Sequence, residues 1–323
     1  MISRRSVISL GAAAALAGTA WAVEARADRR EAQAERDFPP EGRILSVGGR
    51  RVHAVTAGRG ADVVLIHGAG GNARDFTFDL VGRLTGRFRV TAFDRPGLGH
   101  TPALSDAVWS GRGETPAEQA ALWQAAAEQL GIARPVVVGH SYGAAVAMAW
   151  VLDHPAAALV SLAGAVLPWP GPLDPFYRVL GSAPGGAALV PFLTAFASDA
   201  QVRRAIDQVF APQPAPAGYL DHFGAALTLR RASLRASTRQ VNTLLPQVRA
   251  MAPRYPGLTL PVEIVHGDAD RTVGLDIHSR PLAATVASAR LTVLPGVGHM
   301  PHHADPAAAV AAITRAAERA GLR

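Results

Sequence analysis

The chain has 323 residues, of which 49% are hydrophobic and 18% charged, so it is long enough for one or two domains with large cores. It has no cysteine, which excludes disulfides, a thiol nucleophile and a cysteine metal site. The formal net charge of +7 comes from arginines scattered along the chain rather than gathered into a basic stripe, which argues against a nucleic-acid partner.

The first 27 residues carry the features of a targeting segment. Arg4 and Arg5 precede an alanine-rich apolar stretch over residues 7–23, and Ala25-Arg26-Ala27 fits a small-residue cleavage site. The paired arginines also resemble a twin-arginine export signal. We therefore predict that residues 1–27 are a signal peptide or an N-terminal anchor, and that the protein is periplasmic or secreted. Membrane contact is expected only through this segment, if it is not cleaved, and a frayed helix in the cytoplasm is the alternative.

Residues 28–42 are rich in charge and contain Pro39-Pro40, which predicts an exposed linker. Over residues 43–167, strand patterns alternate with helix patterns, and the alternation resumes over residues 258–323. Strands and helices that alternate across short loops imply a mostly parallel sheet covered by helices on both faces. The strands are expected at residues 44–47, 52–56, 62–67, 88–93, 136–138, 159–167, 262–266 and 290–294.

The alternation breaks over residues 168–257, where strand patterns vanish and proline and alanine are frequent. We predict an inserted helical cap, with helices near 192–196, 201–210, 219–232 and 241–251. Its aromatic side chains either line an apolar pocket or pack the cap onto the sheet. They are Trp169, Phe176, Tyr177, Phe192, Phe196, Tyr219 and Phe223.

Residues 136–147 carry the strongest functional signal. Three valines read as a buried strand, Gly139-His140-Ser141-Tyr142-Gly143 as a tight turn, and the small residues that follow as a helix. A serine on such a turn takes a strained backbone conformation that lifts its hydroxyl clear of the sheet, and flanking glycines avoid a crowding Cβ. The following helix directs its N-terminus at the site, which suits a developing negative charge. Ser141 is therefore predicted to be a nucleophile.

A serine hydroxyl is a poor nucleophile unless a base lies within hydrogen-bond reach and a third group orients that base. Asp270 and His299 each follow one of the last two predicted strands. The C-terminal ends of parallel strands share one edge of the sheet, so the loops should bring Ser141, Asp270 and His299 together. Asp268, in the same loop as Asp270, and Asp174, after an earlier strand, are the alternative acids.

Five motifs lie at the ends of predicted strands: His67-Gly68-Ala69-Gly70-Gly71, Asp94-Arg95-Pro96-Gly97-Leu98-Gly99, Gly139-His140-Ser141-Tyr142-Gly143, His266-Gly267-Asp268-Ala269-Asp270 and Gly298-His299. Together they resemble the α/β-hydrolase superfamily, in particular its capped serine-esterase and epoxide-hydrolase-like branch. The resemblance covers about residues 44–322, interrupted by the insert. It implies an α/β-hydrolase fold with an eight-stranded, mostly parallel sheet, flanking helices and a helical cap, and the order Ser…Asp…His is that of the superfamily.

The resemblance also implies roles for individual residues. Ser141 would be the nucleophile, His299 its base, and Asp270 the acid that orients the base. The oxyanion hole would be formed by the backbone N–H groups of Ala69 and Tyr142. Related dehalogenases and epoxide hydrolases carry aspartate where this chain has Ser141, so acyl transfer through an acyl-serine is the implied chemistry. No metal or organic cofactor is implied.

Other polar residues near these motifs have structural readings. His140 is expected to point away from the site into the surroundings of the sheet, His67 to shape the oxyanion loop, and Asp94 to hold the loop that follows it. His302 and His303 are adjacent in sequence. Because adjacent residues do not share one face of a helix, we do not expect these two to form a metal pair.

The sequence thus predicts a serine hydrolase that cleaves a small or medium apolar ester, lactone or related acyl compound. Carbon–carbon bond hydrolases, cofactor-free haloperoxidases or perhydrolases, and hydroxynitrile lyases use similar triads and stay open as alternatives. The alternative of another class is a non-catalytic binding protein on the same fold. Such proteins usually lose a triad member or the oxyanion loop, and this chain keeps both.

Overall fold

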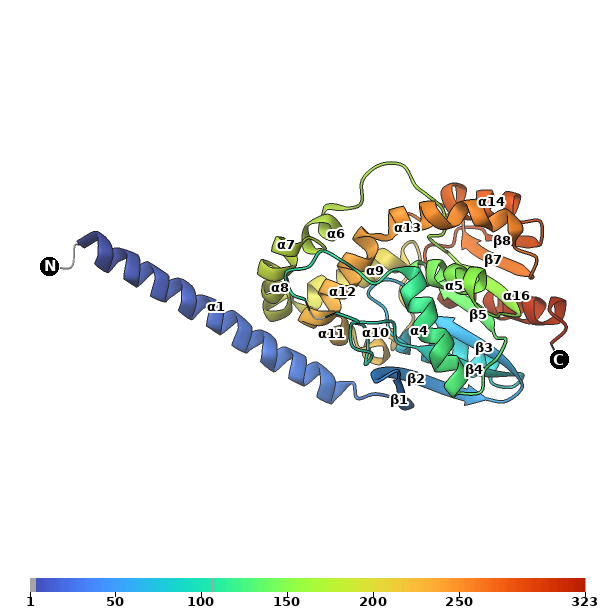
Figure 1. Ribbon diagram of the computed structural model, residues 1–323, viewed down its shortest axis with the longest axis horizontal. Coiled ribbons are helices and arrows are strands. Elements are labelled where there is room, and N and C mark those ends of the chain that lie inside the picture. Colours follow the sequence, from blue (N-terminus) through green and yellow to red (C-terminus); the bar gives the residue numbers. More distant parts are fainter. Residues whose placement is uncertain (1–3, 106, 323) are drawn as a thin grey trace.

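The computed structural model describes residues 4–105 and 107–322, with side chains over residues 17–105 and 107–322. Figure 1 shows a twisted sheet with helices on both faces, a group of further helices at one end, and a long N-terminal helix that extends away from the body. An eight-stranded, mostly parallel sheet between helical layers confirms the predicted fold class.

The strands are β1 (Arg43–Val47), β2 (Arg50–Gly58), β3 (Ala61–Ile66), β4 (Phe88–Phe93), β5 (Val136–His140), β6 (Ala158–Leu162), β7 (Val262–Gly267) and β8 (Ala289–Leu294). They are arranged in the order β1-β2-β4-β3-β5-β6-β7-β8. β2 runs antiparallel to both neighbours, and every other neighbouring pair is parallel. The chain reverses its direction of travel across the sheet between β3 and β5. Loops that leave adjacent strands at such a switch point separate and leave a crevice for a ligand.

The helices that cover the sheet are α2 (Arg74–Thr77), α3 (Leu80–Leu84), α4 (Pro116–Gln129), α5 (Tyr142–Asp153), α14 (Leu275–Thr285), α15 (Pro301–Ala304) and α16 (Pro306–Arg319). Between β3 and β4, residues 74–84 form two short helices, α2 and α3, rather than one. The strand expected over residues 159–167 ends at Leu162. Thr115 and Glu118 form a capping box at the start of α4, where each side chain accepts from the other residue's backbone N–H.

Strand β3 shows how the sequence builds a core on each face of the sheet. Successive side chains of a strand point to opposite faces. Val63 and Leu65 pack into the apolar cluster closed by α3 and α16, while Val64 and Ile66 pack into the cluster closed by α4 and α5. All four side chains are fully buried, which explains why this strand reads as a continuous apolar run.

The insertion between β6 and β7 contains α6 (Pro175–Leu180), α7 (Ala183–Ala188), α8 (Val190–Phe196), α9 (Asp199–Phe210), α10 (Tyr219–Phe223), α11 (Ala225–Thr228), α12 (Arg231–Asn242), α13 (Leu244–Met251) and a 3-10 helix, η1 (Ala252–Gly257). The single helix expected over residues 219–232 is interrupted at residues 229–230 and, before that, at Gly224, which has a φ of +67°. A Cβ at Gly224 would lie 2.8 Å from the ring of Phe38, so this break belongs to a close contact with the segment after the N-terminal helix.

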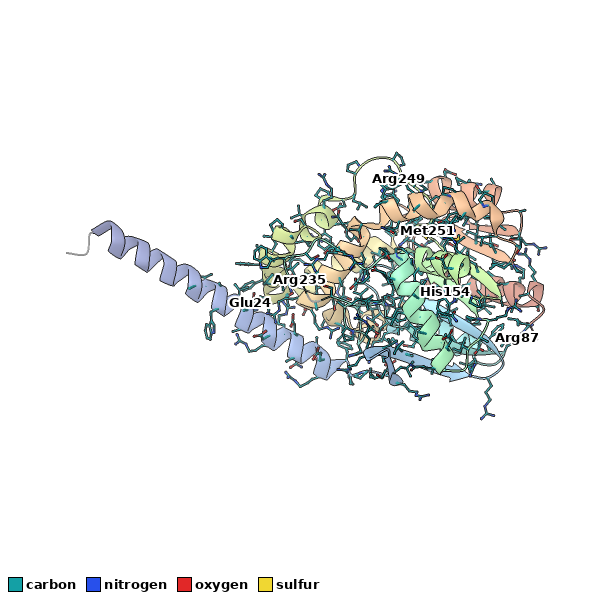
Figure 2. The ribbon with its side chains drawn as sticks, viewed as in Figure 1. Glu24, Arg87, His154, Arg235, Arg249 and Met251 are labelled. Atoms are coloured by element: carbon teal, nitrogen blue, oxygen red, sulfur yellow. The ribbon has the colours of Figure 1, made fainter. Side chains whose placement is uncertain are left out.

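The N-terminal helix α1 (Arg4–Asp37) includes residues 28–37, so most of the segment expected as a linker over residues 28–42 is helical, although most of its residues are exposed as expected. Glu24, Asp28 and Glu31 all form ion pairs with Arg231 of α12. Their spacing places the three carboxylates on one side of the helix. Figure 2 labels Glu24 where α1 passes the cap and Arg235 of α12 in the same region.

Apolar and backbone contacts hold the same part of α1 against the cap. Val23 and Ala27 pack against Ala195 of α8. Arg26 donates to the carbonyl oxygen of Ala195, and Arg30 to that of Ala197, both at 2.7 Å. In the part of the chain that the structure describes, no helix is both long enough and apolar enough to cross a membrane.

Candidate active site

Ser141 lies at the sharp turn between β5 and α5. Its backbone has a φ of 53° and a ψ of −119°, a conformation that residues with a side chain rarely adopt. A Cβ at Gly139 would overlap the carbonyl oxygen of Gly143, and a Cβ at Gly143 would overlap that of Ile66. The two glycines therefore have the steric purpose inferred from the sequence, which is to let α5 begin directly behind the ends of β3 and β5.

The structure brings Ser141, His299 and Asp270 into a continuous series of contacts. His299 Nε2 lies 2.9 Å from Ser141 Oγ, and His299 Nδ1 lies 2.7 Å from Asp270 Oδ2. Because an ionised carboxylate can only accept, Nδ1 carries the proton and Nε2 presents its lone pair to the serine hydroxyl. The three residues leave the C-terminal ends of β5, β7 and β8, the sheet edge expected from the sequence.

Asp270 is held in place by its own loop. Its Oδ1 accepts from the backbone N–H groups of Thr272 and Val273 at 2.8 and 2.9 Å, and its Oδ2 lies 3.1 Å from His266 Nε2. Burial opposes ionisation of Asp270, but hydrogen bonds from His266 and His299 outweigh it and hold the pKa of this carboxyl below its ordinary value. The group is therefore a fixed negative charge behind the imidazole of His299.

The two alternative acids lie elsewhere. Asp268 Oδ1 accepts from the backbone N–H of Gly296 at 2.6 Å, and the residue is exposed. Asp174 caps α6 by accepting from the backbone N–H of Phe176 at 2.7 Å. Neither hydrogen bond reaches His299, so the geometry favours Asp270.

Ala69 and Tyr142 line the same pocket as Ser141. One buried guanidinium, that of Arg95, supports both. Arg95 donates to the carbonyl oxygen of Gly68 at 2.8 Å, and its guanidinium carbon lies 3.9 Å from the centroid of the Tyr142 ring. Burial lowers the pKa of Arg95 to about 10, so it stays charged at neutral pH. No sequence pattern indicated a role for Arg95, although it lies inside the motif Asp94-Arg95-Pro96-Gly97-Leu98-Gly99.

His67 shapes the loop that carries Ala69, as expected. Its Nε2 accepts from the backbone N–H of Arg95 at 2.9 Å, and its Nδ1 lies 3.0 Å from the carbonyl oxygen of Gly68. Burial, and then the charge of Arg95, lowers the pKa of His67 to about 4, so the ring is neutral near pH 7. A neutral imidazole with one N–H and one lone pair matches the two hydrogen bonds that it makes.

A cavity of about 560 Å³ opens above Ser141 and His299. Phe176, Val209 and Ile277 line this cavity and are also exposed to solvent, so they mark its mouth. Of the aromatic residues noted in the insert, five line the cavity, namely Trp169, Phe176, Tyr177, Tyr219 and Phe223. Phe192 and Phe196 lie half-exposed on α8. The cavity is of the size that holds a small or medium organic ligand.

The sequence of this core matches a known family along most of its length. Residues 63–313 match the family described as the Alpha/beta hydrolase family. The chain belongs to the alpha/beta hydrolase family. The resemblance drawn from the five motifs is thus confirmed, and the hydrolase fold accounts for the sheet, the elbow and the helical insertion.

Individual relatives of this hydrolase agree with that assignment. A segment of 55 residues, 17% of the chain, is 53% identical to pimeloyl-(acyl-carrier protein) methyl ester esterase of Methylococcus capsulatus and spans 20% of that protein's length. The solved alpha/beta hydrolase fold protein of Burkholderia ambifaria is 28% identical with a TM-score of 0.71, over 85% of this chain and 97% of its own. An esterase of Exiguobacterium antarcticum is 18% identical with a TM-score of 0.67, over 85% of this chain and 98% of its own, and shares the fold.

In this hydrolase His140 belongs to the pocket wall, so the expectation that its side chain points away from the site is wrong. The ring lies 5.0 Å from that of His299 and 4.7 Å from that of His302, between centroids. Burial, then the neighbouring rings of His302 and His299, lowers the pKa of His140 well below its usual value. The neutral ring uses Nε2–H to donate to the carbonyl oxygen of His299 at 3.0 Å, and it thereby holds the backbone of that residue.

Asp75 was not singled out by the sequence analysis, yet it lines the pocket and joins three elements. Its Oδ2 lies 3.2 Å from His302 Nε2, and its Oδ1 lies 2.9 Å from His303 Nε2 and 2.8 Å from the Tyr219 hydroxyl. His302 and His303 thus meet at one carboxylate, although adjacent residues do not share one face of a helix. The two oxygens of a single carboxylate receive side chains that leave the short helix α15 in different directions.

The side-chain N and O atoms of Asp75, His302 and His303 that could bind a metal lie within 4.8 Å of one another, which is close enough for a cation site. To bind a metal, each imidazole would use Nε2 and carry its proton on Nδ1. Metal-bound histidines normally donate that second N–H to an acceptor. Among the described residues, both Nδ1 atoms are buried without a partner. The surroundings therefore favour imidazoles that donate Nε2–H to Asp75 over imidazoles that bind a metal through Nε2.

Proposed function

We propose that this protein is a serine hydrolase that cleaves a small or medium apolar ester, lactone or related acyl compound through an acyl-serine intermediate. The observation that carries the proposal is the pair of contacts at 2.9 and 2.7 Å that links Ser141 to His299 and His299 to Asp270. The identity of one segment with a methyl ester esterase supports an ester among the possible acyl compounds.

In the first half-reaction, Ser141 Oγ attacks the acyl carbon while its proton passes to His299 Nε2. The ionised Asp270 stabilises the resulting imidazolium without taking the proton. The backbone N–H groups of Ala69 and Tyr142 donate to the oxyanion, and each such donor contributes about 100- to 1,000-fold in rate. The bond to the leaving oxygen then breaks, and His299 returns the proton to that oxygen. Ser141 is left as an acyl ester.

In the second half-reaction, His299 Nε2 takes a proton from a water molecule, and the hydroxide attacks the acyl carbon. The same oxyanion donors stabilise the second tetrahedral intermediate. Ser141 Oγ leaves and recovers its proton from His299, and the carboxylic acid departs. Every atom and proton in these steps comes from the substrate, water and the three side chains.

The pocket supports an apolar acyl chain of limited length. Its volume of about 560 Å³ is modest, and its cap side is lined by side chains such as Tyr177, Ile206 and Leu234. Burying one methylene of the substrate contributes about 0.8 kcal/mol. We expect kcat/KM on p-nitrophenyl esters to rise with acyl chain length until the cavity is filled, and then to fall.

Labelling with a fluorophosphonate probe tests the nucleophile. The wild-type protein should be labelled on one serine, and Ser141→Ala should not be labelled. Ser105→Ala is a matched control because Ser105 is exposed in a loop. Equal labelling of the wild-type protein and Ser141→Ala would show that Ser141 is not the nucleophile.

We also propose that the protein is exported and keeps helix α1. Arg4-Arg5 and the apolar stretch support export, whereas the contacts of Val23, Glu24 and Ala27 with the cap support retention, because cleavage after Ala27 would remove them. Cell fractionation followed by intact mass measurement of the exported protein tests both parts. A mature chain that begins at residue 28 would contradict retention.

A further inference from the structure

The Asp75 carboxylate connects the core, the cap and the segment after His299. It lies on α2 and is buried, and it accepts from His302 and His303 of α15 and from Tyr219 of α10. Burial disfavours the charged form, but the two imidazoles outweigh this and hold the pKa of Asp75 well below its usual value. A buried charge of this kind is stable only while its donors stay in place.

The loop that carries His299 is held on its other side by the cap. Gln213 donates to the carbonyl oxygen of Gly296 at 2.8 Å and accepts from the backbone N–H of Gly298 at 2.9 Å. Met300, the residue after His299, packs into a small apolar cluster with Phe210, Tyr219 and Phe223 of the cap. The position of the base therefore depends on contacts from both the core and the insertion.

We propose that Asp75 and Tyr219 are positioning residues that tie the placement of the cap to the alignment of His299 with Ser141. The inference rests on the proposed function, because it assigns a purpose to contacts behind the proposed base. When α10 moves away, Asp75 loses one of its three hydrogen-bond donors. Its carboxylate is then better solvated if it rotates toward water or the opened pocket. His302 and His303 lose their acceptor geometry, and α15 shifts together with the preceding His299.

The consequence is a base that is aligned while the cap is seated and misaligned when the cap lifts. A displacement of a catalytic group by about 1 Å costs about 100-fold in rate. A small movement of α15 is therefore sufficient to make Ser141 unreactive while the pocket is open. Such coupling would limit the reactivity of Ser141 to the state in which α10 covers the substrate.

A matched pair of variants tests the proposal, because α2 and α10 are joined by three hydrogen bonds, of which only one ends on Asp75. Tyr219→Phe removes the bond that ends on Asp75. Thr77→Val removes the 2.9 Å bond between Thr77 Oγ1 and His222 Nε2 and a longer one, 3.4 Å, from Thr77 Oγ1 to Glu41 Oε2, and neither touches Asp75. Both variants weaken the contact between the same two helices. A difference in kinact between them therefore reports on Asp75 rather than on the packing of the cap in general.

The readout is the inactivation of Ser141 by a fluorophosphonate, separated into the limiting rate constant kinact and the half-saturating concentration KI. Tyr219→Phe should lower kinact about tenfold or more, given the steep dependence of rate on placement of the base. Thr77→Val should leave kinact within about twofold and change KI alone. Asp75→Asn should lower kinact to a similar degree, and adding Tyr219→Phe to it should cause no further loss, because residues that act through one contact are not additive.

The outcomes separate the two proposals. No labelling of the wild-type protein would overturn the proposed function. Normal labelling with equal kinact for Tyr219→Phe and Thr77→Val would overturn the coupling alone. Thermal unfolding of each variant identifies a folding defect. If Tyr219→Phe does not fold, a wild-type kinact for the isosteric Asp75→Asn overturns the coupling instead.

Discussion

Two buried carboxylates of this protein, Asp270 and Asp75, each receive hydrogen bonds from two imidazoles, yet their remaining partners differ in kind. Asp270 takes its other bonds from the backbone N–H groups of Thr272 and Val273, two and three residues away. Asp75 takes its third bond from the Tyr219 hydroxyl, which is 144 residues away in the cap. The first carboxylate is therefore fixed by its own loop, and the second depends on the seating of another part of the molecule.

The imidazoles also use different nitrogens. His299 turns Nδ1 to its carboxylate, so Nε2 is available to Ser141. His302 and His303 turn Nε2 to Asp75, and their Nδ1 atoms are buried without a partner among the described residues. A proton can be relayed only through a ring whose second nitrogen meets a reacting group. Both sites contain histidines beside a carboxylate, so the orientation of the imidazole rings, and not the type of residue, determines whether a ring can pass a proton to a reacting group.

The largest expected effect distinguishes the two carboxylates by rate. Asp270→Asn should lower kcat about 10⁴-fold, because the amide would favour the wrong tautomer of the base. Asp75→Asn should lower it about tenfold, since it changes placement and leaves the triad complete. Steady-state hydrolysis of one p-nitrophenyl ester measures both. Asp268→Asn, in the same loop as Asp270, is the control and should stay close to wild type. Equal losses of kcat for Asp270→Asn and Asp75→Asn would contradict the different roles assigned to the two carboxylates.

Removing the Asp75 carboxylate should also lower the free energy of unfolding. Asp75→Ala leaves the Nε2–H donors of His302 and His303 buried without an acceptor, and each such donor costs about 1–3 kcal/mol. We expect the free energy of unfolding to fall by about 3 kcal/mol, measured by urea unfolding with tryptophan fluorescence. Asp276→Ala is the control, because that side chain is 84% exposed and should cause no measurable change. A wild-type stability for Asp75→Ala would mean that water replaces the carboxylate.

The pH dependence of stability separates the histidines from the carboxylates. The pKa of His67 falls from 6.5 to about 4 on folding, so between these values the unfolded chain binds a proton that the folded protein does not. Stability should therefore fall as the pH is lowered from 6.5 to 4, by about 3 kcal/mol from this residue. Asp75 and Asp270 have lowered pKa values in the folded protein, so their stabilisation is present above pH 3.8 and is lost only as the pH falls further.

Urea unfolding at a series of pH values measures this difference. His67→Gln keeps an acceptor for the backbone N–H of Arg95 and cannot titrate, so its stability should depend less steeply on pH between 6.5 and 4 than that of the wild-type protein. An unchanged slope would show that His67 is already neutral in the unfolded chain or charged in the folded one.

The smallest expected effect concerns the carboxylates of α1, which lie at the surface rather than in the core. Glu31 is the most buried of the three that pair with Arg231, and burial is outweighed there by hydrogen bonds from Arg231, which lower the pKa of Glu31. Glu31→Gln should lower the free energy of unfolding by about 0.5–1 kcal/mol. Glu35→Gln, which breaks a more exposed pair with Arg230, should have less effect. Thermal unfolding and limited trypsin digestion within α1 compare the two variants.

The features that the sequence predicted well are those that one short segment specifies. The elbow needs a buried strand, two glycines and a helix within a dozen residues, and the geometry of Ser141 matches that expectation. The loops that end in Asp270 and His299 were predicted because parallel strands expose their C-terminal ends at one edge. The buried strand runs were equally clear, since each sends alternate side chains into a different core.

The features that the sequence missed depend on distant partners. The expected linker over residues 28–42 is mostly helix because Arg231 gathers the carboxylates of α1, and that arginine is about 200 residues away. The break at Gly224 reflects a ring from Phe38. His140 was expected to turn away, but the backbone of His299 provides an acceptor beside the pocket. In each case the contact that decides the conformation is nonlocal, so the local pattern could not indicate it.

By itself, the sequence determined the order of strands and helices along the chain, the position of Ser141 on its sharp turn and the edge of the sheet where Ser141, Asp270 and His299 meet. Those properties follow from backbone preferences and apolar periodicity, which neighbouring residues define. Only the tertiary structure decided that Asp75 meets His302 and His303, 227 and 228 residues away, and that a tyrosine of the cap shares the same carboxylate. The hydrogen-bond donors to a buried charge are set by the packing of elements that are distant in sequence, so no local sequence pattern predicts them.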